Sequence, residues 1–140
     1  MTLFHISVDI AASPERVWTV MSDAARWPEW TPTVTSIELL DPGPWKVGSR
    51  ARIRQPKLPP AVWRMTEFNQ GTGFTWITGG PFVRVTARHW IESLPAGSRA
   101  TLSIRFSGLF GALAARLTRN LNETYLALEA QGLKARSESG

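Results

Sequence analysis

Cysteine is absent from the 140-residue chain, and histidine occurs at only two positions, 5 and 89. Without cysteine the chain has no disulfide bonds, no thiol nucleophile and no cysteine-ligated metal. His5 has the outward parity of a strand, so no histidine metal cluster is expected either. Nucleotide motifs are also missing, because the glycines at 71 and 73 precede a strand pattern rather than a helix. We therefore expect neither a metal nor an organic cofactor.

Long apolar runs are missing as well. No stretch approaches the ~20 apolar residues of a transmembrane segment, and the first ten residues lack a signal-peptide pattern. Because nothing in the sequence demands an oxidising compartment, we expect a cytoplasmic protein. The length predicts a single domain over residues 1–136, followed by a disordered tail over residues 137–140.

Tryptophan and basic residues are abundant instead. Seven tryptophans in so short a chain need a large internal surface, which is either a packed core or a lined cavity. The chain has 16 Lys and Arg against 11 Asp and Glu, a formal net charge of +5. This balance predicts a basic surface.

The C-terminal part has the clearest helical periodicity, and residues 108–136 are predicted to form one long amphipathic helix. Asn122 and Glu129 fall on the face opposite the apolar stripe, and Leu126 and Leu133 fall on the solvent side, where they are candidates for a dimer contact. We accordingly expect a monomer or a homodimer. The stripe expected to be buried consists of Phe110, Leu113, Leu117, Leu121, Thr124 and Leu128.

The rest of the chain alternates like strands. Residues 2–11 form the first, and Ser13-Pro14-Glu15 predicts a helix from Pro14 to about Ser22, followed by a second short helix from Asp23. Short connections rich in turn residues predict antiparallel neighbours. The fold class is α+β, a curved seven-stranded antiparallel sheet on a long C-terminal helix. The remaining strands are predicted at 34–40, 50–55, 61–68, 74–78, 82–93 and 99–107.

The segment IAASPERVWTVMSDAARWPEW, residues 10–30, resembles the N-terminal signature of the polyketide cyclase/dehydrase branch of the START-like (SRPBCC) superfamily. GSRATLSIRF, residues 97–106, and the closing helix resemble the rest of that family, so the resemblance covers almost the whole chain. It implies a helix-grip fold with strand order 2-3-4-5-6-7-1 and a cavity between sheet and helix. It says less about function, because the superfamily includes lipid carriers, quinone-binding proteins and polyketide aromatase/cyclases.

With that strand order, side-chain parity indicates which residues face the helix. The inward face is mostly apolar, interrupted by Gln55, Glu67 and His89. On the fourth strand we take Trp63 and Met65 as inward, since burying an unpaired arginine costs more than exposing a phenylalanine. Such an enclosure is typical of a site for a lipid, an isoprenoid-quinone or a polyketide-like molecule. The predicted ligand-binding residues are Trp30, Ile53, Trp63, Met65, Phe74, Trp76, Val85, His89, Leu113, Leu117, Asn120, Leu121 and Thr124.

An enzyme is the first alternative. Glu67 and His89, if they share the cavity, form an acid/base pair for a cyclase or dehydratase reaction without a cofactor. If they do not, they are polar core residues satisfied by their neighbours. The resemblance implies that aromatase/cyclases carry an arginine late on the fourth strand and a tyrosine after the Trp-Pro segment. This chain has Asn69 and Val34 there, which favours binding without turnover.

An interaction module is the second alternative. The outward parity places many arginines on one sheet surface, which either attracts an anionic surface or keeps an exposed sheet soluble. Two loops, residues 41–47 with Trp45 and residues 79–82, are predicted to form the rim of the cavity entrance. The arginines proposed for the anionic surface are Arg50, Arg52, Arg54, Arg84 and Arg88.

Overall fold

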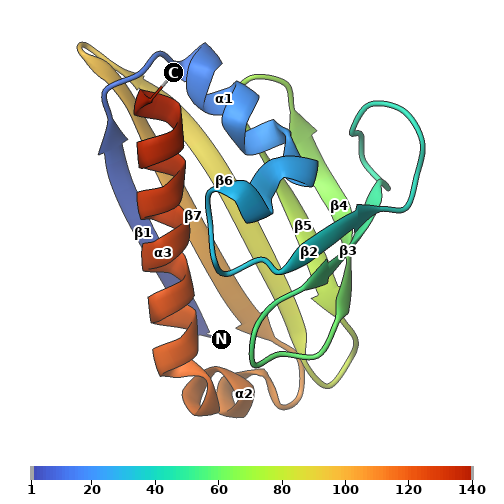
Figure 1. Cartoon of the computed structure of the whole chain (residues 1–140). Coiled ribbons are helices and arrows are strands. Elements are labelled where there is room, and N and C mark those ends of the chain that lie inside the picture. The colour runs from blue at the N-terminus through green and yellow to red at the C-terminus, as the bar shows by residue number, and fades with distance from the viewer. Residues whose placement is uncertain (1, 140) are drawn as a thin grey trace.

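One antiparallel sheet of seven strands organises the computed structural model, which describes residues 2–139 (Figure 1). The strand order is β1-β7-β6-β5-β4-β3-β2, as the resemblance implied. Neighbouring strands are antiparallel throughout, and β6 and β7 form the longest pair. The strands are β1 (Thr2–Ile10), β2 (Ser36–Leu39), β3 (Arg50–Arg54), β4 (Ala61–Asn69), β5 (Gly73–Gly79), β6 (Arg84–Leu94) and β7 (Gly97–Ser107).

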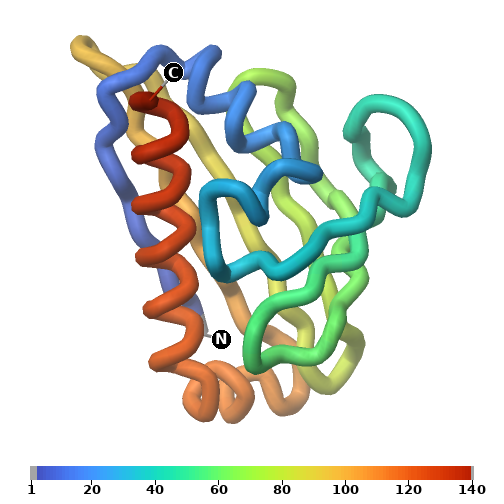
Figure 2. Tube along the Cα trace, in the orientation of Figure 1, coloured from blue at the N-terminus to red at the C-terminus, as the bar shows by residue number. Residues whose placement is uncertain are grey.

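Two short helices connect β1 to β2, as predicted. Helix α1 (Pro14–Ser22) begins at the predicted cap, where the Ser13 side chain accepts a hydrogen bond from the Arg16 backbone N–H and proline occupies the first turn. The 3-10 helix η1 (Ala24–Glu29) follows. Both lie on the same face of the sheet as the C-terminal helix, as the chain trace in Figure 2 shows. This face is the inner one, which holds the core.

The C-terminal helix is interrupted, so the prediction of one helix over residues 108–136 is wrong. Helices α2 (Gly111–Leu117) and α3 (Arg119–Glu138) meet at Thr118, whose ψ of 14° is not helical. The Thr118 hydroxyl donates to the Ala114 carbonyl at 2.7 Å and accepts from the Asn122 amide at 2.9 Å, bonds that compete with the helical ladder. Helix α3 then continues through Glu138, so residues 137 and 138 are helical rather than a disordered tail. Residue 140 lies outside the described part.

The buried face of α3 is also not the predicted one. Leu126 and Leu133 are 4% and 1% exposed, so they belong to the core and do not form a dimer contact. Leu117 is 76% exposed. The projection failed because it carried the phase of residues 110–117 across the break at Thr118, and because it assigned polar residues to the outside. The buried residues of α3 are Asn122, Tyr125, Leu126, Ala130, Leu133 and Ser137.

A β-bulge in β4 reverses the predicted orientation of Glu67. The register with β5 shifts between Met65 and Glu67, so Met65 is buried while the next two side chains are exposed. Glu67 accepts a hydrogen bond from the Thr75 hydroxyl at 2.9 Å and lies 3.9 Å from the Arg88 guanidinium. Phe68 then returns to the inner face, where its ring lies 5.7 Å from that of Trp18.

The outer face of the sheet carries the predicted arginines, and several of them have carboxylate partners. Arg50 pairs with Asp41 at 3.0 Å, Arg52 with Glu38 at 2.8 Å and Arg99 with Asp9 at 2.8 Å. These pairs reduce the positive potential of the face, so attraction of an anionic surface to it stays a prediction. Among residues 2–139, every helix is too short or too polar to cross a bilayer.

The two faces of the C-terminal helices differ in what truncation should cost. We expect Leu133→Ala to lower the free energy of unfolding by about 2 to 5 kcal/mol, because Leu133 is in the core. Leu117→Ala should change it by less than about 0.5 kcal/mol, because that side chain faces solvent. Urea unfolding followed by tryptophan fluorescence measures both. Equal losses would contradict this assignment of the helix faces.

Candidate functional site

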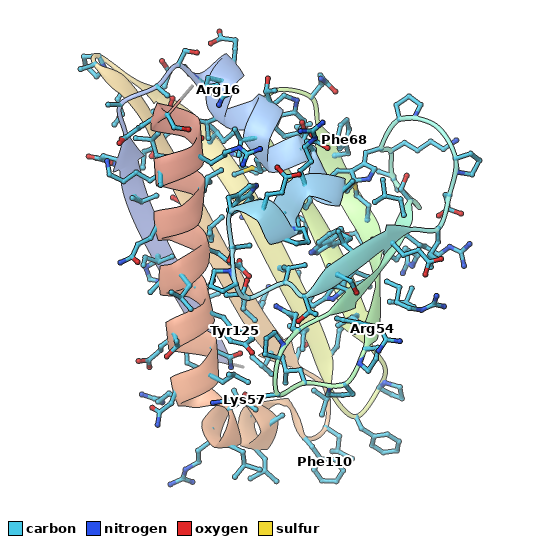
Figure 3. All side chains as sticks on the ribbon, viewed as in Figure 1. Arg16, Arg54, Lys57, Phe68, Phe110 and Tyr125 are labelled. Atoms are coloured by element: carbon cyan, nitrogen blue, oxygen red, sulfur yellow. The ribbon has the colours of Figure 1, made fainter. Side chains whose placement is uncertain are left out.

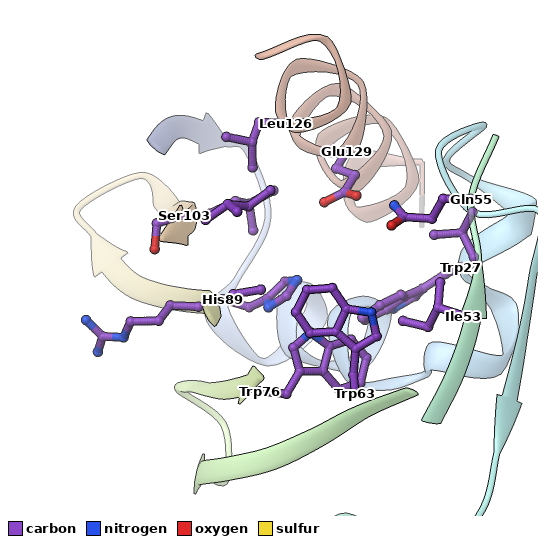
Figure 4. A pocket seen from close by; sticks show the side chains of 14 residues that line it. Trp27, Ile53, Gln55, Trp63, Trp76, His89, Ser103, Leu126 and Glu129 are labelled. Atoms are coloured by element: carbon purple, nitrogen blue, oxygen red, sulfur yellow. The ribbon is translucent and has the colours of Figure 1, made fainter. Parts of the chain in front are cut away.

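A small cavity lies between α3 and the inner face of the sheet (Figure 4). Its main part has a volume of about 60 Å³, and a second lobe adds about 10 Å³. Because a water molecule occupies roughly 30 Å³ in the liquid, this space holds only a few waters. The two lobes share Trp27, Val34, His89, Leu102 and Glu129.

Aromatic side chains fill most of the interior beside this cavity. The His89 and Phe74 rings stack with centroids 4.4 Å apart, and Trp27 and Trp76 meet edge to face at 5.4 Å. Trp45 enters from the β2–β3 loop, with its ring 5.0 Å from Phe74. The tryptophans therefore mainly build a packed core, with the cavity at its edge. Trp45 is part of that core, and residues 79–82 line neither lobe.

Glu129 of α3 provides the carboxyl group of this cavity, in the place that the sequence assigned to Glu67. The Thr33 hydroxyl donates to Glu129 Oε1 at 3.0 Å, and Thr33 in turn shares a 2.9 Å hydrogen bond with Thr31. Burial raises the pKa of Glu129 to about 7, and the hydrogen bond from Thr33 opposes part of that rise. Near neutral pH the group therefore exists in both protonation states. Sequence reasoning missed it because the helical projection placed it on the solvent side.

Two ring nitrogens near this carboxyl group have no hydrogen-bond partner. They are Nδ1 of His89 and Nε1 of Trp63, both buried. Burial lowers the pKa of His89 to about 3, so its imidazole is neutral and offers one donor and one acceptor. The Trp63 indole offers a donor only. An unsatisfied buried polar group costs roughly 1 to 3 kcal/mol, so both nitrogens favour a molecule that supplies a partner.

The structure brings together part of the predicted ligand-binding set. Ile53, Trp63, Trp76 and His89 line the main cavity, as does Gln55, and Trp30 lines the smaller lobe. Figure 4 shows Gln55 and Glu129 on opposite sides of the space, above the aromatic rings. Val34, at the position of the family tyrosine, lines both lobes, whereas Asn69 is exposed at the end of β4.

Other predicted residues lie elsewhere. Met65 and Phe74 are fully buried core residues, and Val85 packs against the same core. Leu113 is 54% exposed on α2, so this helix does not cover the cavity as predicted. The last three of the set line an open groove on the outside of α3 rather than the cavity: Asn120, Leu121 and Thr124.

The acid/base pair predicted at Glu67 and His89 does not form. Glu67 lies on the outer face of the sheet and His89 lines the inner cavity. The groups that the structure places around the same cavity are Glu129 and His89. Within residues 2–139 no group of three His, Asp or Glu side chains is arranged to hold a metal ion.

Known proteins resemble this chain mainly in fold. An uncharacterised protein of Mycobacterium tuberculosis (strain ATCC 25618 / H37Rv) is 34% identical over 47 residues, which are 34% of this chain and only 28% of that protein. The Zhui aromatase/cyclase of Streptomyces sp. R1128 has a TM-score of 0.81 at 15% identity, over 98% of this chain and 93% of its own. The protein TTHA0849 of Thermus thermophilus has a TM-score of 0.77 at 19% identity, over 99% and 98%.

At these identities the likeness to solved structures shows the helix-grip fold alone. The family assignment comes from the sequence itself. Residues 1–138 match the model of a family described as polyketide cyclase / dehydrase and lipid transport. The chain belongs to this polyketide cyclase/dehydrase and lipid transport family.

Proposed function

We propose that the protein binds a small, mainly hydrophobic molecule in the cavity between α3 and the sheet. The observation that carries this proposal is the set of polar groups around one apolar space: the unpartnered nitrogens of His89 and Trp63, and the Glu129 carboxyl group. A few convergent polar groups in an apolar enclosure are typical of sites that orient a ligand. Family membership supports the same role.

The polar groups favour one kind of ligand among the lipids, isoprenoid-quinones and polyketide-like molecules. The Trp63 indole donates to an oxygen, and Glu129 donates as well when it holds its proton. Neutral His89 either donates or accepts. A carbonyl or phenol oxygen satisfies these groups, whereas an ionised ligand would be poorly solvated there and would repel an ionised Glu129. A quinone or a polyketide-like molecule therefore fits better than a fatty-acid anion.

A ligand of this size requires the cavity to open. An engineered cavity of ~150 Å³ is needed to hold benzene, and this one measures about 60 Å³. The segment 55–60 is the expected gate. It connects the cavity residue Gln55 to the outer groove, and the Tyr125 hydroxyl of α3 donates a hydrogen bond to the Pro56 carbonyl within it. Breaking this contact lets the segment move away from α3.

A second candidate function is a cyclase or dehydratase reaction. The observation that favours it is the pKa of Glu129, raised to about 7 by burial, because an acid/base catalyst works best near the ambient pH. Neutral His89 would hold a substrate oxygen rather than take up a proton, since its pKa is about 3. Glu67, on the outer face, has no part in this proposal.

Ligand binding can be tested directly. We expect native mass spectrometry of freshly purified protein to show a copurifying apolar molecule, and tryptophan fluorescence to respond to quinones and aromatic polyketides. Trp63→Phe, which removes one hydrogen bond, should raise the Kd by roughly 2- to 10-fold. Trp90→Phe is the matched control, because Trp90 contacts Arg88 at 5.0 Å on the outer face. No copurifying molecule and no fluorescence response would contradict the proposal.

Catalysis has a separate test. If an aromatic polyketide substrate is turned over, Glu129→Gln should reduce kcat by roughly 10²- to 10⁴-fold, because the amide keeps the shape but carries no transferable proton. Glu67→Gln should leave kcat unchanged, since Glu67 is on the outer face of the sheet. Binding without any turnover by the wild-type protein would exclude the enzyme and leave a carrier.

The buried carboxyl group also predicts a pH dependence of stability. The pKa of Glu129 rises from 4.5 in the unfolded chain to about 7 in the native state, so the native state binds this proton more tightly. Relative to Glu129→Gln, the wild-type protein should lose up to about 3 kcal/mol of unfolding free energy as the pH rises from 4.5 through 7.

His89 acts in the opposite direction. Its native pKa is lowered from 6.5 to about 3, so its stabilising contribution is lost as the pH falls through that range. Since His89 is present in both chains, its effect cancels when urea unfolding of the wild type and Glu129→Gln is compared at each pH. Glu123→Gln, an exposed change on the same helix, is the control and should give a constant difference. Parallel curves for wild type and Glu129→Gln would contradict the raised pKa.

A further inference from the structure

Large apolar side chains gather on the end of the molecule formed by α2 and the β5–β6 turn. Nine large apolar side chains are exposed among residues 2–139, and five of them lie here, with exposed fractions from 51% to 76%. Figure 3 shows Phe110 projecting from this end, away from the sheet and α3. We call this surface the apolar tip. It consists of Phe82, Leu109, Phe110, Leu113 and Leu117.

Backbone hydrogen bonds hold these side chains in their exposed positions. The N–H of Leu109 donates to the Pro81 carbonyl at 3.1 Å, and that of Phe110 donates to the Phe82 carbonyl at 2.7 Å. The Phe82 and Phe110 rings stack with centroids 6.0 Å apart. Leu113 and Leu117 follow Leu109 at four-residue spacing, so they extend the same surface along α2. Contiguous exposed apolar surface of this kind marks an interaction site.

The charge around the apolar tip has one sign. Residues 54–60, 79–88 and 108–122 together contain six basic residues and no Asp or Glu. Lys57, Arg84, Arg116 and Arg119 are exposed, and within the described chain no carboxylate lies within ion-pair distance of them. The arginines of the outer sheet face differ in this respect, since several of them pair with acidic side chains.

We propose that the apolar tip docks onto an anionic lipid bilayer. Apolar side chains enter the boundary between headgroups and acyl chains, and surrounding basic side chains attract the headgroup phosphates. A bilayer fits both parts of the surface at once, because it offers negative charge above an apolar layer. Docking does not require the cavity to bind anything, so it is independent of the proposed function.

The position of the apolar tip relative to the cavity gives this docking a consequence. Lys57, Arg116 and Leu117 line the outer groove together with Pro56 and Tyr125. A bilayer in contact with the tip therefore lies beside the segment 55–60, where the Tyr125 hydroxyl donates to the Pro56 carbonyl. This segment also leads to Gln55, which lines the cavity. Docking thus places the expected gate at the membrane surface.

Co-sedimentation with vesicles tests the proposal. At low ionic strength, the wild-type protein should sediment with vesicles of equal parts phosphatidylcholine and phosphatidylglycerol, and not with phosphatidylcholine alone. Added salt should weaken the binding. Leu113→Ser combined with Leu117→Ser should reduce the affinity roughly tenfold or more. Arg116→Gln and Arg119→Gln should each reduce it roughly fivefold.

Matched variants show whether the apolar tip is the surface involved. Leu39→Ser with Val47→Ser removes two exposed apolar side chains from the β2–β3 hairpin, and Arg50→Gln with Arg52→Gln removes two arginines from the outer sheet face. Both should bind vesicles like the wild type. All substituted side chains are exposed, so circular dichroism and thermal unfolding should show intact folds for every variant.

Three results would overturn the proposal. The first is loss of binding in the outer-face variant with full binding by the tip variants, which would place the lipid site on the sheet. The second is no vesicle binding by a wild-type dimer that the leucine variant converts to a monomer, which would assign the tip to a second copy of the chain. The third is no vesicle binding by a monomeric wild type, which would leave a protein partner.

Discussion

The close approach of α3 to the segment after η1 determines much of this structure. Gly132 lies so near the Trp30 carbonyl that a Cβ atom there would overlap the oxygen, so the helix comes nearer to this segment than any other residue would allow. The contact fixes the rotation of α3 about its axis. Leu126, Ala130 and Leu133 then face the sheet, and Glu129 faces the cavity from the same side. A different rotation would place the carboxyl group in water and leave an apolar helix face exposed.

A buried carboxyl group on this face brings a cost that its surroundings only partly offset. Thr33 supplies one hydrogen bond to Glu129, and Thr31 orients Thr33, but the pKa still rises to about 7. A side chain kept only for packing would be more stable as a leucine or glutamine. The unpartnered nitrogens of His89 and Trp63 add to the cost in the same small space. Three polar groups that individually weaken the core, and together surround one cavity, are better explained by a ligand than by stability.

The sequence predicted the sheet well, because alternation is a local signal and each strand end carries turn residues. It also predicted the start of α1, since Ser13 and Pro14 act within one turn. Its failures have a different origin. The break at Thr118 depends on a side-chain hydrogen bond between neighbouring turns, and the bulge before Glu67 depends on pairing with β5. Neither leaves a periodic pattern in the sequence. Together they exchanged Glu67 for Glu129 in the predicted site, so the carboxyl group was expected in the cavity but on the wrong element.

Tyr125 connects the interior of the protein with its apolar tip. One helical turn separates it from Glu129, and its hydroxyl bonds to the Pro56 carbonyl at the edge of the outer groove. Burial raises the pKa of this phenol, and the nearby Glu129 charge adds to that rise, so the hydroxyl keeps its proton and remains a donor. The hydrogen bond closes the cavity with a single neutral contact rather than with an ion pair. Such a contact is inexpensive to break where a headgroup or a ligand oxygen offers the phenol another acceptor.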